Sequence, residues 1–186
     1  MIIIGIIGKA GSGKSTLSKY LVDNFDFTRV SFADPLKQMC INAGMVTPEE
    51  CYGENKTEHS RWVLQKVGTE IFRNQVNPDY LVEEMDETLY ELIEDGLSRF
   101  VIDDLRFPNE ANFVKSFQTG TTIRLIREDF LDSTAGTTHA SESLQDTIIP
   151  DYTITAKSGD IQTLQDEMRI ILIQLYSAWQ SLCWRG

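Results

Sequence analysis

Eight residues near the N-terminus have the types and spacing of a phosphate-binding loop. They run from Gly8 to Ser15 with the sequence GKAGSGKS, which fits the pattern G-x-x-x-x-G-K-[ST]. Glycines let the backbone bend so that successive N–H groups point at phosphate oxygens, and the helix that follows adds its positive end. We expect Lys14 to reach the β- and γ-phosphates of a nucleotide and the Ser15 hydroxyl to coordinate Mg²⁺. The residues predicted to bind the nucleotide are Gly11, Ser12, Gly13, Lys14, Ser15 and Thr16.

The loop alone predicts either ATP or GTP, and two further patterns argue against a GTPase switch. Such GTPases share a DxxG element, but no Asp in this chain has Gly three residues later. They also share a guanine-reading NKxD. Residues 55–58 read NKTE, which ends in Glu, and they come before the strand expected over 100–102, whose carboxylates are the magnesium candidates. These two patterns disfavour a GTPase switch and leave the choice between ATP and GTP open at this point.

Two carboxylates stand at the end of the short apolar strand expected over 100–102. Mg²⁺ keeps its waters and binds one or two carboxylates, so Asp103 is predicted to hold the ion through a water molecule, with Asp104 nearby. A helix-capping role for these carboxylates is the alternative. Arg106 follows and is predicted to stabilise the transferring phosphoryl group, because a planar guanidinium matches the equatorial phosphate oxygens.

Two arginines lie in the strand expected over 122–126 and at its exit. Arg127 stands where the strand ends, which is the edge at which parallel sheets bind ligands. It is a second candidate for the phosphoryl group. Arg124 lies inside the strand and is interpreted as a structural partner in the sheet.

The segment Phe32–Lys37, with the sequence FADPLK, follows the strand expected over 28–32. Pro35 fits the first turn of a helix with Asp34 as its N-cap, and a ligand role for Asp34 stays open beside that interpretation. Lys37 would then lie in the first helical turn, beside the cleft.

A helix expected over 60–74 carries polar residues on an otherwise apolar sequence. Arg61 and Arg73 bracket Gln65 and Thr69, and the latter two are four residues apart and so share a face. Solvation is the ordinary role of such residues, but an acceptor phosphate and a base edge would need the same groups.

His139, in a polar loop, is either incidental or a hydrogen-bonding group.

Strand and helix patterns alternate along the chain, and this predicts an α/β fold. The continuous apolar run over 2–7 is typical of a strand buried on both faces of a parallel sheet. The amphipathic spacing over 79–94 and over 161–182 predicts helices. Strands are expected over 2–7, 28–32, 100–102, 122–126 and 152–155, and helices after the loop and over 35–43, 60–74, 79–94, 108–117 and 161–182. Strands separated by helices imply a parallel sheet of right-handed connections.

Composition limits the classes of protein to which the chain can belong. Its 186 residues suit a single domain, which we expect to span 1–186. With 17 basic and 28 acidic residues the net charge is -11, which argues against a nucleic-acid partner. Apolar runs are too short to span a bilayer, and the N-terminus does not fit a secretory signal, so no membrane partner and a cytoplasmic location are expected. The three cysteines lack a CxxC spacing and are interpreted as reduced thiols.

Taken together, these residues resemble the deoxynucleoside monophosphate kinases of bacteriophages, a branch of the P-loop nucleotide kinases. The resemblance rests on the phosphate-binding loop, FADPLK over 32–37, Leu64-Gln65 with Gly68-Thr69-Glu70 and Arg73, VIDDLRFPNEA over 101–111 and HASE over 139–142. The VIDDLRFPNEA block and the Gly68-Thr69-Glu70 sequence are much more specific than the loop, which many NTPases share. The resemblance implies a P-loop NTPase fold with about five parallel strands flanked by helices, a monophosphate-binding region over 38–98 and a short lid over 128–138. It implies transfer of the ATP γ-phosphate to a dNMP with Mg²⁺, often by a homodimer, in the host cytoplasm if the gene is a phage's.

Carried onto this chain, the resemblance divides the candidate residues between the two substrates. The catalytic group is Lys14, Asp103, Arg106 and Arg127, and the metal group is Ser15 and Asp103. The acceptor group is Asp34, Lys37, Arg61, Gln65, Thr69, Arg73, Asp104, His139 and Glu142. The expected lid is acidic at 128–132 and carries no arginine, which gives Arg106 and Arg127 more of the charge neutralisation.

Two alternatives stay open at this point. A P-loop kinase for another small metabolite, with a dephospho-coenzyme A-like or phosphomevalonate-like acceptor, would share the loop and the arginines. A regulatory module that binds ATP without transferring phosphate would show no acceptor-dependent ADP production.

Overall fold

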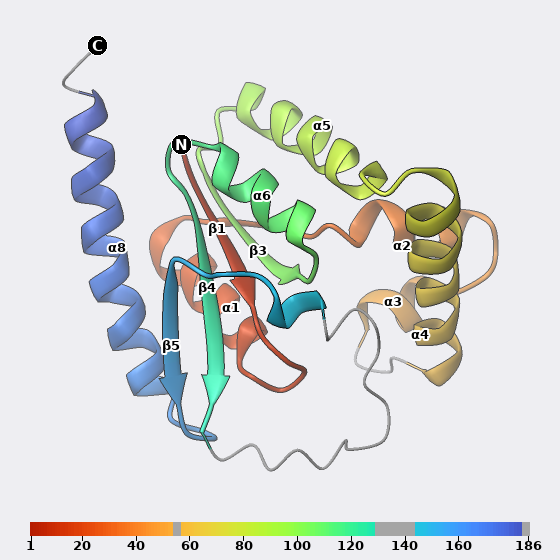
Figure 1. Cartoon of the computed structure of the whole chain (residues 1–186), viewed down its shortest axis with the longest axis horizontal. Coiled ribbons are helices and arrows are strands. Elements are labelled where there is room, and N and C mark those ends of the chain that lie inside the picture. The colour runs from red at the N-terminus through yellow and green to blue at the C-terminus, as the bar shows by residue number, and fades with distance from the viewer. Residues whose placement is uncertain (54–56, 129–143, 184–186) are drawn as a thin grey trace. The chain divides into compact units, whose positions relative to one another are not determined.

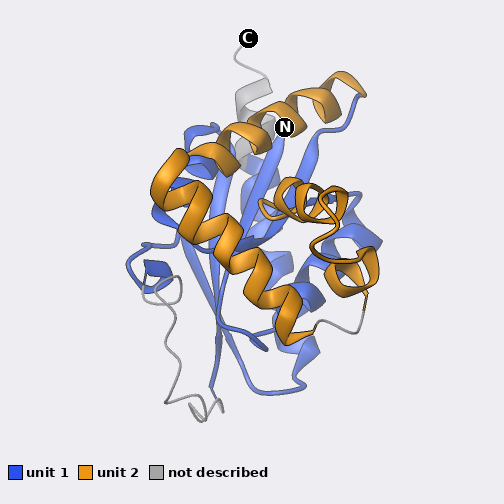
Figure 2. Cartoon of the chain, turned by 90° about the vertical axis from the view of Figure 1, so that its right-hand side faces the viewer, with its two compact units in different colours: residues 1–30, 96–186 blue, residues 31–95 orange. Residues whose placement is uncertain are grey.

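The computed structural model describes residues 1–53, 57–128 and 144–183, without the side chains of 178–183. The chain forms two compact units, which Figure 2 colours separately. The first comprises residues 1–30 and 96–186, and the second residues 31–95. Each unit is described by itself.

The first unit is built on a parallel sheet of five strands, as the sequence predicts (Figure 1). Their order is β2-β3-β1-β4-β5, and every neighbouring pair is parallel. The central strand β1 is buried along its whole length because it pairs with β3 on one side and β4 on the other. The strands are β1 (Ile2–Ile7), β2 (Thr28–Val30), β3 (Arg99–Leu105), β4 (Gly120–Arg127) and β5 (Tyr152–Ala156).

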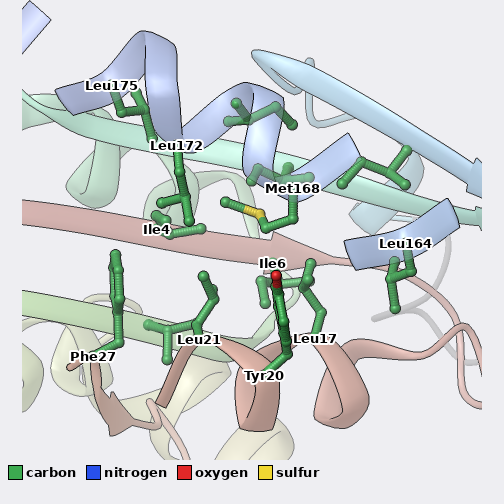
Figure 3. Close-up of a cluster of buried hydrophobic side chains, with 14 of the residues drawn as sticks. Ile4, Ile6, Leu17, Tyr20, Leu21, Phe27, Leu164, Met168, Leu172 and Leu175 are labelled. Atoms are coloured by element: carbon green, nitrogen blue, oxygen red, sulfur yellow. The ribbon is translucent and has the colours of Figure 1, made fainter. Parts of the chain in front are cut away.

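Helices of the first unit cover this sheet and close its core. The helices are α1 (Lys14–Phe25), α6 (Pro108–Ser116) and α8 (Ile161–Cys183). Figure 3 shows the apolar side chains of α1 and α8 gathered around Ile4 and Ile6 of β1. The buried α8 residues recur at helical spacing, which explains the stripe seen in the sequence: they are Leu164, Met168, Ile171, Leu172 and Leu175.

The second unit is helical and has a small core of its own. Buried side chains of three of its helices and of Val46 form that core: Leu36, Cys40, Val46, Cys51 and Val63. Cys40 and Cys51 are free thiols, as expected, and burial raises the pKa of Cys40, with the nearby Cys51 adding to the effect. The helices are α2 (Asp34–Asn42), α3 (Pro48–Tyr52), α4 (Glu58–Gln65), the π-helix η1 (Lys66–Val76) and α5 (Tyr80–Glu94).

Several local expectations are corrected by the structure. Strand β3 continues to Leu105, past the expected end at 102, so that Asp103 lies within the sheet. The expected helix over 60–74 is helical, but from Lys66 onward it is wound as a π-helix. Asp34 is not an N-cap: α2 begins at Asp34 itself, and Ala33 is the capping residue.

Among the helices of the described residues, none is long and apolar enough to cross a membrane.

Candidate active site

The phosphate-binding loop follows β1 directly and owes its shape to glycines. A side chain at Gly8 would lie 2.5 Å from the Ser12 hydroxyl and 3.0 Å from the Leu125 carbonyl, so only glycine fits there. Gly13 has a φ of +98°, a conformation that L side chains rarely adopt, and α1 begins at the next residue. The backbone therefore brings the positive end of α1 to the loop, which is the arrangement that phosphate binding requires.

Lys14, the first residue of α1, points back over the loop. Its ammonium donates hydrogen bonds to the carbonyl oxygens of Gly8 and Lys9, the latter at 2.8 Å. The charge is thus held where the sequence analysis expects phosphates to lie. Ser15 and Thr16 follow in the first turn of the helix, and both are exposed.

A pocket of about 270 Å³ opens beside the loop within the first unit. Its walls come from the loop, from the carboxyl end of β4 and from residues 145–146. This position agrees with the rule that open parallel sheets bind ligands at the carboxyl ends of their strands. The lining residues are Gly8, Lys9, Ala10, Ser12, Arg124, Leu125, Ile126, Arg127, Gln145 and Asp146.

Arg127 joins the pocket wall to the loop. Its guanidinium donates to the Gly11 carbonyl at 3.1 Å and also to the Ser158 hydroxyl. The strand exit that the sequence identifies therefore does lie against the phosphate-binding loop. In this arrangement Arg127 holds the loop's backbone, and its role toward a phosphoryl group stays a prediction.

Arg124 has the structural role expected of it, although it also lines the pocket. Its guanidinium donates to the carbonyl oxygens of Gln145 at 2.9 Å and of Ile148 at 2.6 Å, and lies 3.5 Å from the Asp146 carboxylate. These contacts attach residues 145–148 to β4. The side chain of Gln145 is buried, and sequence reasoning missed it because its partners are far away along the chain.

Asp103 is engaged by a residue that the sequence analysis did not single out. Both of its carboxylate oxygens accept from the Arg29 guanidinium of β2, at 2.9 and 2.8 Å. This bidentate pair explains how a carboxylate can be buried inside β3. It also means that a metal near Asp103 would share that carboxylate with an arginine.

The residues present fit a magnesium ion that depends on the nucleotide. A serine hydroxyl and one carboxylate, with waters and phosphate oxygens, are the ligands Mg²⁺ prefers. In the part of the chain that the structure describes, no three His, Cys, Asp or Glu residues form a metal cluster. That Ser15 and Asp103 hold the ion together with ATP stays a prediction.

Arg106 leaves the sheet just after β3, on a backbone that a buried carboxylate fixes. Glu110 of α6 is 2% exposed and accepts from the N–H groups of Arg106 at 2.8 Å and of Phe107 at 3.0 Å. The Arg106 side chain itself is exposed, and neither it nor Asp104 lines the pocket. Glu110 is therefore the residue that orients the turn from which Arg106 projects.

The acceptor candidates Asp34 and Lys37 lie together at the start of α2, in the second unit. The Lys37 ammonium bonds the Asp34 carboxylate at 2.6 Å and lies 4.9 Å from the centre of the Tyr52 ring. The Lys37 side chain is only 13% exposed, so its charge is held by these neighbours. The expected position in the first helical turn is confirmed.

The other acceptor candidates lie along α4 and η1. Arg61 is exposed, whereas Gln65, Thr69 and Arg73 are half-buried. Arg73 donates to the Pro78 carbonyl at 3.2 Å, across the turn into α5. The π-helix begins between Gln65 and Thr69, and π-helical turns are frequent at functional sites.

Three expectations fall outside the described residues. His139 and Glu142 belong to the segment 129–143, and so does all of the expected lid except Glu128.

Comparison with known proteins places this site in a family. No family model matches the sequence. Over 135 residues, however, the chain is 33% identical to a protein of Acanthamoeba polyphaga mimivirus that is provisionally named a deoxynucleotide monophosphate kinase. The match covers 62% of this chain and 69% of the mimivirus protein. The chain belongs to the same family of P-loop kinases.

Solved structures share the fold of this kinase. A Thermus thermophilus protein superposes with a TM-score of 0.53 at 16% identity, over 94% of this chain and 97% of that one. Shikimate kinase from Acinetobacter baumannii, in complex with shikimate, gives 0.51 at 16% identity over 94% of both chains. Dephospho-CoA kinase from Campylobacter jejuni gives 0.50 at 16% identity, over 91% of this chain and 95% of that one. These likenesses show the P-loop fold alone. Membership of the family of the mimivirus protein makes the chain an ATP-dependent phosphotransferase.

Proposed function

We propose that this kinase transfers the γ-phosphate of ATP to a 2′-deoxynucleoside 5′-monophosphate, giving the diphosphate and ADP. The observation that carries the proposal is the 33% identity to the mimivirus protein named for that acceptor. The blocks VIDDLRFPNEA and Gly68-Thr69-Glu70, on which the resemblance to phage kinases rests, support the same acceptor.

On the donor side, the loop's backbone would bind the phosphates and Lys14 would leave its carbonyl partners to bridge the β- and γ-phosphates. Bound Mg²⁺ would supply charge neutralisation, held by Ser15 and Asp103. Arg106, on the turn that Glu110 fixes, would contact the transferring group, because charge develops on its equatorial oxygens.

On the acceptor side, the second unit would hold the monophosphate. Lys37 and Arg73 offer cationic groups, and Gln65 and Thr69 offer hydrogen bonds to a base. A carboxylate and a carbonyl already occupy Lys37 and Arg73, so the acceptor phosphate would have to exchange with these partners. The remaining acceptor candidates within the described residues are Asp34, Arg61 and Asp104.

The wider assignments of the resemblance stay predictions of this proposal. They are a homodimer, a cytoplasmic location and a role in nucleotide metabolism.

The test is ADP release from Mg-ATP with each of the four dNMPs and their ribose counterparts supplied singly, and with dephospho-coenzyme A as an unrelated acceptor. We expect turnover with at least one dNMP, at least 100-fold above the rate without acceptor. Lys14→Ala should abolish it, and Lys19→Ala, on an exposed part of α1, is the matched control. Turnover with dephospho-coenzyme A and with no dNMP would show that the acceptor is not a deoxynucleotide. ATP binding without turnover on any of these acceptors would also contradict the proposal.

A further inference from the structure

A buried glutamine joins the carboxyl ends of two strands beside the phosphate-binding loop. Gln145 is 5% exposed, and its side-chain amide donates to the Leu105 carbonyl at 3.0 Å and to the Gly8 carbonyl at 3.4 Å. A carboxamide has two N–H donors, so it can serve both oxygens at once. The first carbonyl ends β3, and the second begins the loop.

The position of this amide is fixed from β4. Arg124 donates to the backbone carbonyls of Gln145 and Ile148, at 2.9 and 2.6 Å, and holds both ends of the short segment between them. These contacts fix the backbone that carries the amide, and the side chain itself is buried. Hydrogen bonds thus tie together the start of the loop, the end of β3 and Arg124 of β4.

The Gly8 carbonyl is shared between Gln145 and the lysine expected to bind the phosphates. Its buried carbonyl oxygen accepts from Gln145 and also from the Lys14 ammonium. A carbonyl has two lone pairs, so the two donors do not exclude each other. When ATP binds, Lys14 must reach the phosphates and so leaves this oxygen. A buried carbonyl that loses its donor costs binding free energy unless another donor remains.

We propose that Gln145 is a positioning residue for nucleotide binding: it keeps the Gly8 carbonyl hydrogen-bonded after Lys14 moves to the phosphates. The inference rests on ATP binding by the kinase and not on the identity of the acceptor. Gln145 thus lowers the cost of releasing Lys14 and holds the start of the loop in place while the lysine moves.

The proposal makes a prediction that a packing role does not share. When Lys14 is present and the Gln145 donors are lost, the Gly8 carbonyl still accepts a hydrogen bond from Lys14 in the nucleotide-free protein. In the nucleotide-bound protein it has neither donor. In a Lys14→Met background, the same loss affects the free and the nucleotide-bound protein equally, because no lysine bonds the Gly8 carbonyl in either state. The effect of Gln145 on affinity should therefore depend on Lys14.

The experiment is a double-mutant cycle read by calorimetric binding of ADP, with no acceptor present. Gln145→Met removes both donors at nearly constant length, and we expect it to weaken ADP binding about tenfold, which corresponds to about 1.4 kcal/mol. In Lys14→Met the further change to Gln145→Met should cost less than twofold. Gln162→Leu, an exposed glutamine of α8 that bonds Asp166, is the matched control.

Thermal melting without ligand separates folding from binding. If Gln145→Met melts below the assay temperature, Gln145→His replaces it, because its ring keeps one N–H donor, and a smaller loss of affinity is expected. Equal losses with and without Lys14, or no loss in the native background, would overturn the proposal. A wrong acceptor assignment would leave all of these results unchanged.

Discussion

The phosphate-binding loop of the first unit and the helices of the second unit hold their candidate residues in different ways. Around the loop, contacts join residues far apart in sequence, such as Arg127 with Gly11 and Gln145 with Gly8. In the second unit the charged side chains bond near neighbours, as Lys37 does with Asp34 and Lys66 with Glu70. The donor site is thus shaped by backbone and by tertiary contacts, whereas the acceptor candidates rely on local partners.

This difference has a consequence for binding. The hydrogen bond from Arg73 to the Pro78 carbonyl is exposed, so an acceptor phosphate can displace that carbonyl at small cost. Lys37 is only 13% exposed, so exchanging Asp34 for a phosphate at that site costs more. Changes in the second unit should therefore alter one substrate's KM modestly. Changes at the loop should act on the reaction itself, because the loop's charges lie where the phosphates react.

The largest effect should come from Lys14→Ala. The substitution removes the cation that we propose bridges the β- and γ-phosphates. We expect kcat to fall about 1,000-fold or more, since such charges contribute several kcal/mol to the transition state. Steady-state kinetics of ADP release measure it. A tenfold fall or less would show that the loop is not where charge neutralisation is concentrated.

Arg106→Ala should have the next largest effect. We expect kcat to fall about 100-fold with little change in either KM, because the guanidinium acts on the charge that develops during transfer. Arg106→Lys should recover part of the rate. An unchanged kcat would remove Arg106 from the catalytic group and leave Arg127 as the candidate.

Arg73→Ala tests the other half of the comparison. It should raise the KM for the acceptor about tenfold and the KM for ATP less than twofold, because the side chain belongs to the unit assigned to the acceptor. Initial rates with each substrate varied in turn give both constants. Since Arg73 also bonds the Pro78 carbonyl, the melting temperature is measured in parallel. Equal changes in both constants contradict the assignment.

The smallest effect concerns the sheet that carries the donor site. Burial alone would raise the pKa of Asp151, but hydrogen bonds from the Thr122 N–H and hydroxyl, together with Lys115, lower it below the ordinary value. A lowered folded-state pKa contributes stability that is present above about pH 3.9, the unfolded value, and is lost as the pH falls through the folded value. Asp151→Asn should therefore weaken the fall in the free energy of unfolding between pH 5 and pH 2, as measured by urea unfolding at a series of pH values. An unchanged fall would contradict this role.

Patterns that depend on local sequence predicted much of this structure. The buried isoleucine run of β1, the glycine-rich loop and the apolar spacing of α8 each indicate their element directly. The short helix α3 also has a readable signal that was missed, because Thr47 and Glu50 form a capping box around Pro48.

What the sequence did not predict depends on distant partners. In the sequence, a carboxylate such as Asp103 indicates that a strand has ended. Its burial inside β3 is explained by the pair with Arg29, which is 74 residues away in the chain. Gln145 is separated from Gly8 by 137 residues, so no local pattern distinguishes it from a surface glutamine. The donor side was therefore predictable in its loop and not in the contacts that support it.

The most direct test of the proposed transfer follows the phosphate itself. ATP labelled in its γ-phosphate is incubated with Mg²⁺, the kinase and the dNMP that gives the highest turnover, and the products are separated. We predict that the label appears in the deoxynucleoside diphosphate in equal amount to the ADP formed. Label released as inorganic phosphate, at a rate that the dNMP does not change, would contradict transfer to a deoxynucleotide.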